Sequence, residues 1–69
     1  MTVTVLIRRN VYTDWLEAHV AQDGRNGENL LRGRKCPSVS DAKQRVRAEL
    51  RIAIAAGVDI VWDVEEDGD

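Results

Sequence analysis

The sequence predicts a single small α+β domain, in which an antiparallel-rich sheet of three to four strands carries one amphipathic helix on one face, in the order β-β-β-α-β. Two segments near the ends of the chain alternate apolar and polar residues, which is the period of a half-buried strand. Between them, the segment after the one proline has apolar residues at helical spacing. A chain of 69 residues forms one domain whose core is barely sufficient for stability.

The first strand is expected over residues 2–8, sequence TVTVLIR. Val3, Val5 and Ile7 fall on one face of this segment, and β-branched residues are enriched in strands. The other face carries Thr2, Thr4, Leu6 and Arg8.

Residues 13–22, sequence TDWLEAHVAQ, fit either a strand or a short helix. As a strand, the segment directs Leu16 inward and Trp15 and His19 outward. As a helix, it begins with Thr13 as a cap and contains good helix formers. We favour the strand because the following DGRNG is typical of a hairpin turn, and ENLLRGRK then forms a returning strand, expected over residues 28–35.

The helix is expected over residues 39–56. Ser38 and Asp41 stand three residues apart, the spacing of a capping box at a helix N-terminus. Gly57 can take the left-handed conformation that commonly ends a helix. A strand then follows over residues 58–65, with apolar side chains on one face. Its other face carries Asp59, Val61, Asp63 and Glu65, and an acidic end follows over residues 66–69.

Charge is distributed unevenly along the chain. Residues 1–53 contain ten bases and six acids, a net charge of +4, whereas residues 54–69 contain six acids and no base, a net charge of −6. This asymmetry predicts two oppositely charged surfaces on one domain, each able to attract a partner.

Few residues are available for catalysis or metal binding. His19 and Cys36 are the only histidine and cysteine, and their spacing does not bring them together as a base and a nucleophile. One histidine and one cysteine do not make a zinc site, and the calcium-like DVEEDGD lacks the closing glutamate. GRNG lacks the lysine of a phosphate loop. We therefore expect no enzymatic activity, no metal and no cofactor.

Localisation is predicted from three further features. Cys36 has no partner for a disulfide within the chain, which is typical of a reducing compartment. The N-terminal segment does not resemble a signal peptide, and no apolar run approaches the roughly 20 residues of a membrane span. We expect a cytoplasmic protein that does not contact a membrane.

Two surfaces are predicted to bind a partner. One helix covers one face of a sheet, so Leu6, Trp15 and Val61 on the open face are candidates for a partner or dimer contact. The acidic candidates at the last strand either contact a basic partner or protect an exposed sheet edge from aggregation. These acids are Asp59, Asp63, Glu65 and Glu66.

A basic surface is the alternative site, and it would bind nucleic acid through phosphate contacts. Its residues are Arg32, Arg34, Lys35, Lys43, Arg47 and Arg51. Nearby Asp41 and Glu49 oppose this role, and the absence of phenylalanine leaves few aromatic rings on which bases stack.

Three functions remain open. We favour a non-enzymatic protein-binding module, of the kind that phages and mobile elements use to inhibit a nucleic-acid-processing complex such as a bacterial defence system. The alternatives are a small nucleic-acid-binding or transcription-regulating protein, and a structural accessory that folds as a homodimer.

Overall fold

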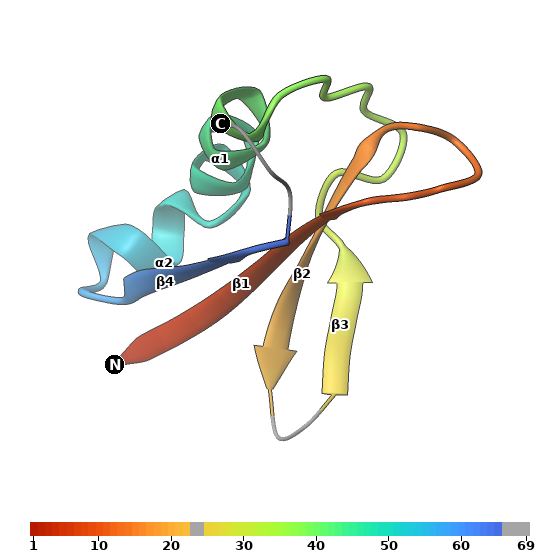
Figure 1. The fold of residues 1–69 in the computed structure, drawn as a ribbon. Helices are drawn as coiled ribbons and strands as arrows, with labels where there is room; N and C mark the ends of the chain where they lie inside the picture. The colour runs from red at the N-terminus through yellow and green to blue at the C-terminus, as the bar shows by residue number, and fades with distance from the viewer. Residues whose placement is uncertain (23–24, 66–69) are drawn as a thin grey trace.

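A computed structural model describes residues 1–22 and 25–65, and it shows a mixed four-stranded sheet with two helices on one side (Figure 1). The elements are β1 (Thr2–Arg9), β2 (Leu16–Gln22), β3 (Arg25–Asn29), α1 (Val39–Glu49), α2 (Arg51–Ala55) and β4 (Asp59–Val64). The sheet order is β3-β2-β1-β4; β1–β2 and β2–β3 are antiparallel, and β1–β4 is parallel. The predicted α+β fold is confirmed. The expected acidic end at residues 66–69 lies outside the described residues.

The core lies between the sheet and the helices. Val5 and Ile7 of β1 are fully buried, as their alternation predicted, and they pack with residues of β2 and α1. The connection between β3 and α1 adds two further buried residues, Leu31 and Cys36. The other members of this core cluster are Leu16, Ala18, Val39, Ala42 and Val46.

The preference for a strand within residues 13–22 is confirmed, and the helical alternative is wrong. The strand begins only at Leu16, because a hydrogen-bonded loop occupies the preceding residues. Asp14 in this loop has a φ of 64°, a left-handed conformation that aspartate tolerates better than most residues.

The prediction of a strand over residues 28–35 is wrong in its position. The chain reverses earlier than expected, so β3 already begins at Arg25 and ends at Asn29. The Asn29 side chain then ends the strand, because its Oδ1 accepts hydrogen bonds from the backbone amides of Ala18 at 3.0 Å and Leu31 at 2.9 Å. The following residues form turns, with Gly33 at a φ of 75°.

The helical segment begins as predicted, since the Ser38 hydroxyl accepts a hydrogen bond from the amide of Asp41 at 3.2 Å. It is divided at Leu50 into α1 and α2, although backbone hydrogen bonds of 2.9 Å continue on both sides of that residue. No proline or glycine lies at the division. Gly57, with a φ of 98°, follows α2 as expected. Within the described part of the chain, neither helix reaches the length or apolar character that a membrane span requires.

Candidate partner-binding surfaces

Two of the acidic candidates, Asp59 and Asp63, lie on β4, which forms one edge of the sheet (Figure 1), and Glu65 directly follows this strand. The residues of β4 alternate between half-buried side chains, which face the helices, and exposed ones, which face away from them. Successive exposed side chains on one face of a strand are about 6.8 Å apart. We use the name acidic row for the exposed residues of β4 together with the exposed residue that directly follows it. The row consists of Asp59, Val61, Asp63 and Glu65.

The acidic row includes an apolar position at its centre. Val61 is 49% exposed, and it lies beside Thr4 of β1 in the register of the sheet. Asp59 and Asp63, on either side of it, are also exposed. The row therefore offers carboxylates around one accessible apolar side chain. Glu66, the fourth predicted acid, lies outside the described residues.

The three apolar candidates for the open face do not form one surface. Leu6 lies on this face, between His19 of β2 and Asp63 of β4, but these neighbours leave it only 9% exposed. Trp15 lies before β2, and its ring centre is 5.9 Å from Nζ of Lys35. Val61 alone among the three is both on the open face and accessible.

Five of the six basic candidates form two groups. Lys43 and Arg47 of α1 extend over the ring of Trp62, with Nζ and Cζ each 5.6 Å from its centre. Such contacts stabilise the position of Trp62, which is half-buried. The second group is in the loop before α1 and lines the same surface hollow as Trp15. This loop group consists of Arg32, Arg34 and Lys35, whereas Arg51 is exposed at the start of α2.

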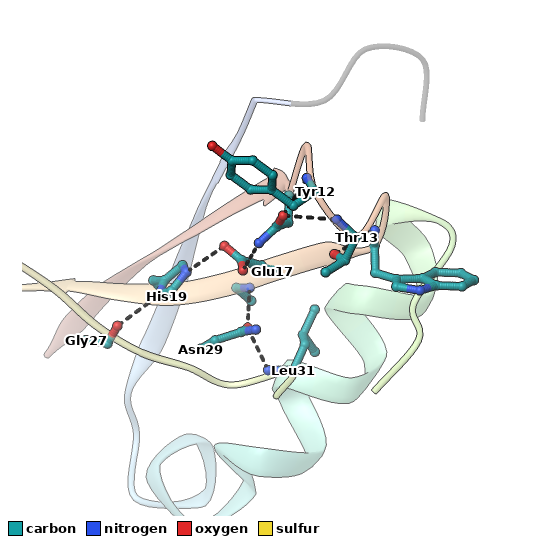
Figure 2. Close-up of polar contacts among 10 residues, drawn as sticks. Tyr12, Thr13, Glu17, His19, Gly27, Asn29 and Leu31 are labelled. Carbon is teal, nitrogen blue, oxygen red and sulfur yellow. Dashed lines mark hydrogen bonds and ion pairs between the residues drawn. The ribbon is translucent and has the colours of Figure 1, made fainter. Parts of the chain in front are cut away.

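A hydrogen-bonded network lies on the open face at β2 and β3, on the side of the sheet opposite to β4 (Figure 2). Nδ1 of His19 is 2.8 Å from the carbonyl oxygen of Gly27, and Nε2 is 3.3 Å from Oε1 of Glu17. A carbonyl oxygen only accepts, so Nδ1 is the donor in the first contact. Nδ2 of Asn10 donates to Oε2 of Glu17 at 2.8 Å. The hydrogen bond from Asn10, followed by the hydrogen bond and charge of His19, holds the pKa of Glu17 below its ordinary value of 4.5, although desolvation acts in the opposite direction.

We expect Glu17 to contribute stability that is lost in acid. A carboxyl whose pKa is lower in the folded than in the unfolded chain stabilises the fold above the unfolded value, and this contribution disappears as the pH falls through the folded value. Urea unfolding of the wild type and of Glu17→Gln should therefore show a free-energy difference near pH 7 that shrinks towards pH 3. The matched control is Glu28→Gln, an exposed acid on β3. A difference for Glu17→Gln that is independent of pH would contradict this account.

Asn10 also organises the loop between β1 and β2, a feature that was not predicted from the sequence. Its Oδ1 accepts hydrogen bonds from the amides of Tyr12 at 2.8 Å and Thr13 at 3.2 Å. The guanidinium of Arg9 donates to the carbonyl of Asp14 at 2.6 Å. The loop presents a highly exposed tyrosine, since Tyr12 is 94% accessible. The position of Asn10 shortly after a predicted strand could have indicated this turn, because an asparagine side chain commonly accepts a hydrogen bond from the backbone amide two residues later.

The only histidine and cysteine lie on opposite faces of the sheet. His19 belongs to the open face, whereas Cys36 is buried in the core beneath the helices. The structure therefore does not assemble the one base–nucleophile pair that the sequence contains. Across the described residues, His, Cys, Asp and Glu side chains form no group of three or more suited to a metal ion.

Comparison of the chain with models of protein families, with curated proteins and with solved structures gave no match.

Proposed function

We propose that the protein is a non-enzymatic binding module whose acidic row contacts a basic surface of another protein. One observation supports this function above the others: β4 is an edge strand whose exposed face carries Asp59 and Asp63 around an accessible Val61, and the exposed Glu65 follows directly. Carboxylates arranged in this way attract a positively charged partner and set its orientation. The apolar centre supplies surface that becomes buried on contact.

The partner class follows from the charge of the row. Surfaces rich in lysine and arginine are typical of proteins that bind nucleic acid. We therefore propose that the target is a nucleic-acid-processing complex, and that the protein inhibits it by occupying its basic surface. A phage or mobile-element protein directed against a bacterial defence system is the biological setting that we favour.

Charge reversal on β4 should remove partner binding. We expect Asp59→Lys combined with Asp63→Lys to weaken binding by at least about tenfold, because two attractive contacts become repulsive. The measurement is affinity capture from cell extract with quantitative mass spectrometry, comparing the wild type with this variant. Glu28→Lys is the matched control, since it reverses an exposed acid on β3, at the opposite edge of the sheet.

Three comparisons decide the outcome. Proteins retained by the wild type and by Glu28→Lys, but lost from the β4 variant, are the expected result. Lys43→Ala with Arg51→Ala should retain the same proteins. Equal retention by all variants would contradict the proposed role of the acidic row.

Nucleic-acid binding is the second candidate, and the contact between Lys35 and Trp15 favours it. A cation 5.9 Å from the centre of a half-buried aromatic ring, with Arg32 and Arg34 in the same loop, combines phosphate attraction with a ring on which a base can stack. Titration of duplex and single-stranded nucleic acid across a salt series tests it. Binding that weakens steeply with salt, and is lost in Arg32→Ala with Arg34→Ala, would replace the first proposal.

A further inference from the structure

Backbone groups at the outer edge of β4 are not paired by any described strand. The amide of Asp59 donates to the carbonyl of Met1, and the amide of Glu65 donates to the carbonyl of Ile7, both at 2.9 Å. Successive residues of a strand direct their amide and carbonyl groups to alternate sides. The odd-numbered residues of β4 therefore face β1, and the even-numbered ones face outwards. The outward groups are those of Ile60, Trp62 and Val64.

The helix side of this edge has both apolar and charged groups. Ile60 and Trp62 direct half-buried side chains to this side, where both pack against the core. A surface hollow opens beside them, between α2 and the start of β4. It is lined by Arg47, Ile54, Val58, Asp59, Ile60 and Trp62. A strand placed along the edge would direct every second side chain to this side, where apolar residues would contact Ile60 and Trp62.

A second copy of β4 fits the edge poorly. If two copies pair in antiparallel orientation around Val61, Asp59 of each copy lies opposite Asp63 of the other. These residues direct their backbone groups away from the added strand, and such pairs bring their Cα atoms to about 4.5 Å. Like charges directly opposite each other destabilise a sheet, whereas opposite charges stabilise it. The acids on β4 therefore oppose pairing with a second copy of β4. They favour pairing with a strand that carries lysine or arginine at the positions opposite Asp59 and Asp63.

We infer that the partner contributes an extended segment that adds to β4 as a fifth, antiparallel strand, with basic side chains over the acidic row and apolar side chains against Ile60 and Trp62. This inference rests on the proposed function and specifies how the acidic row contacts its partner. Main-chain hydrogen bonds to Ile60, Trp62 and Val64 hold the segment, and alternate side chains provide specificity. Antiparallel orientation is chosen because it is slightly more stable per residue than parallel pairing.

A synthetic peptide tests the inference with the whole protein. The probe is a blocked heptapeptide of sequence KVKVKVK, compared with the rearranged KKKVVVK and the acidic EVEVEVE. Affinity is measured by calorimetry, and amide exchange is followed by NMR. We expect KVKVKVK to bind most tightly and to protect the outward amides of Ile60, Trp62 and Val64. Asp59→Asn with Asp63→Asn should weaken its binding, and Glu28→Gln should not.

Backbone methylation separates strand addition from simple charge attraction. In an antiparallel pair, the valine amides of the peptide face β4 and the lysine amides face away. Methylation of the valine amides should weaken binding by at least about tenfold, because the hydrogen bonds to the outward carbonyls are lost. Methylation of the lysine amides is the matched control and should have little effect.

The remaining outcomes overturn the inference. Equal binding of KVKVKVK, KKKVVVK and both methylated forms would show charge attraction without strand addition, and the proposed function would survive. Failure of every basic peptide to bind would remove both the inference and the proposed function. Tighter binding of EVEVEVE, or a dimer in sedimentation whose outward β4 amides are already protected, would show that the edge takes an acidic strand or a second copy instead.

Discussion

Replacement of Ile7 with alanine is expected to cost about 2–5 kcal/mol of unfolding free energy. Ile7 is 0% exposed at the centre of the sheet, where β1 pairs it with Ala18 of β2 and Val64 of β4. Strands hydrogen-bonded on both sides do not move inwards to fill the cavity. A chain of 69 residues has a total stability of only roughly 3–10 kcal/mol, so much of the variant should be unfolded. Urea unfolding followed by tryptophan fluorescence measures the change.

The control for Ile7→Ala removes an equally apolar but exposed side chain. Val11, in the loop after β1, is 86% exposed, and Val11→Ala should change stability by no more than about 0.5 kcal/mol. Similar losses for the two variants would mean that the core is not built around β1. The same reasoning applies to Leu6, whose side chain is only 9% exposed on the open face. A charge at Leu6 would unfold the chain itself, so Val61 is the position at which a dimer contact is properly tested.

The alternating and capped segments of the fold are predictable from the sequence, because their signals are local. The apolar period of β1 and the switch to period two after Gly57 identify β1 and the edge strand β4, which pair in parallel. Ser38 marks the start of α1 through one hydrogen bond within a single turn. The hairpin was misplaced because DGRNG contains several residues suited to a turn, and the choice among them depends on pairing with β2.

The acidic row was also predictable, since strand period alone places its side chains on one face. The grouping of the other candidates was not, because it depends on where elements meet. Strand period assigned Trp15 to the open face, yet the strand begins one residue later and the ring is near Lys35. The even spacing of Lys43 and Arg47 indicated one helix side, but nothing in that spacing shows that both extend over Trp62.

Charge is thus divided across the two faces of β4 as well as along the chain. The open face of the strand is acidic, and its helix side carries the cations of Lys43 and Arg47 over Trp62. A strand paired with β4 would therefore have negative charge beside its open face and positive charge beside its helix-facing side. Pairing of two copies of this edge is opposed by the acids, which is how natural sheets discourage aggregation. Protection of the edge and selection of a basic partner are consequences of the same side chains.

Replacement of Asn29 with alanine is expected to cost about 2–4 kcal/mol, although it removes only one polar side chain. Its Oδ1 accepts hydrogen bonds from the amides of Ala18, in β2, and Leu31, in the loop. Ala18 and Leu31 are themselves buried, so alanine at this position leaves two amides without an acceptor in a poorly hydrated place. Urea unfolding measures the loss, and exchange of these two amides locates it.

Asn29→Asp is the matched control, because it keeps an oxygen at the accepting position and should retain most of the stability. The difference between Asn29→Ala and Asn29→Asp should also affect the loop that carries Arg32 and Arg34. Leu31 is 1% exposed and anchors the turn that carries Arg32 and Arg34, so its release in Asn29→Ala should free these cations from their place near Trp15. A fall in any nucleic-acid affinity of Asn29→Ala, without a change in binding of the basic peptide to β4, would assign the two surfaces independent roles. Equal stability of Asn29→Ala and Asn29→Asp would instead show that the accepting oxygen is dispensable.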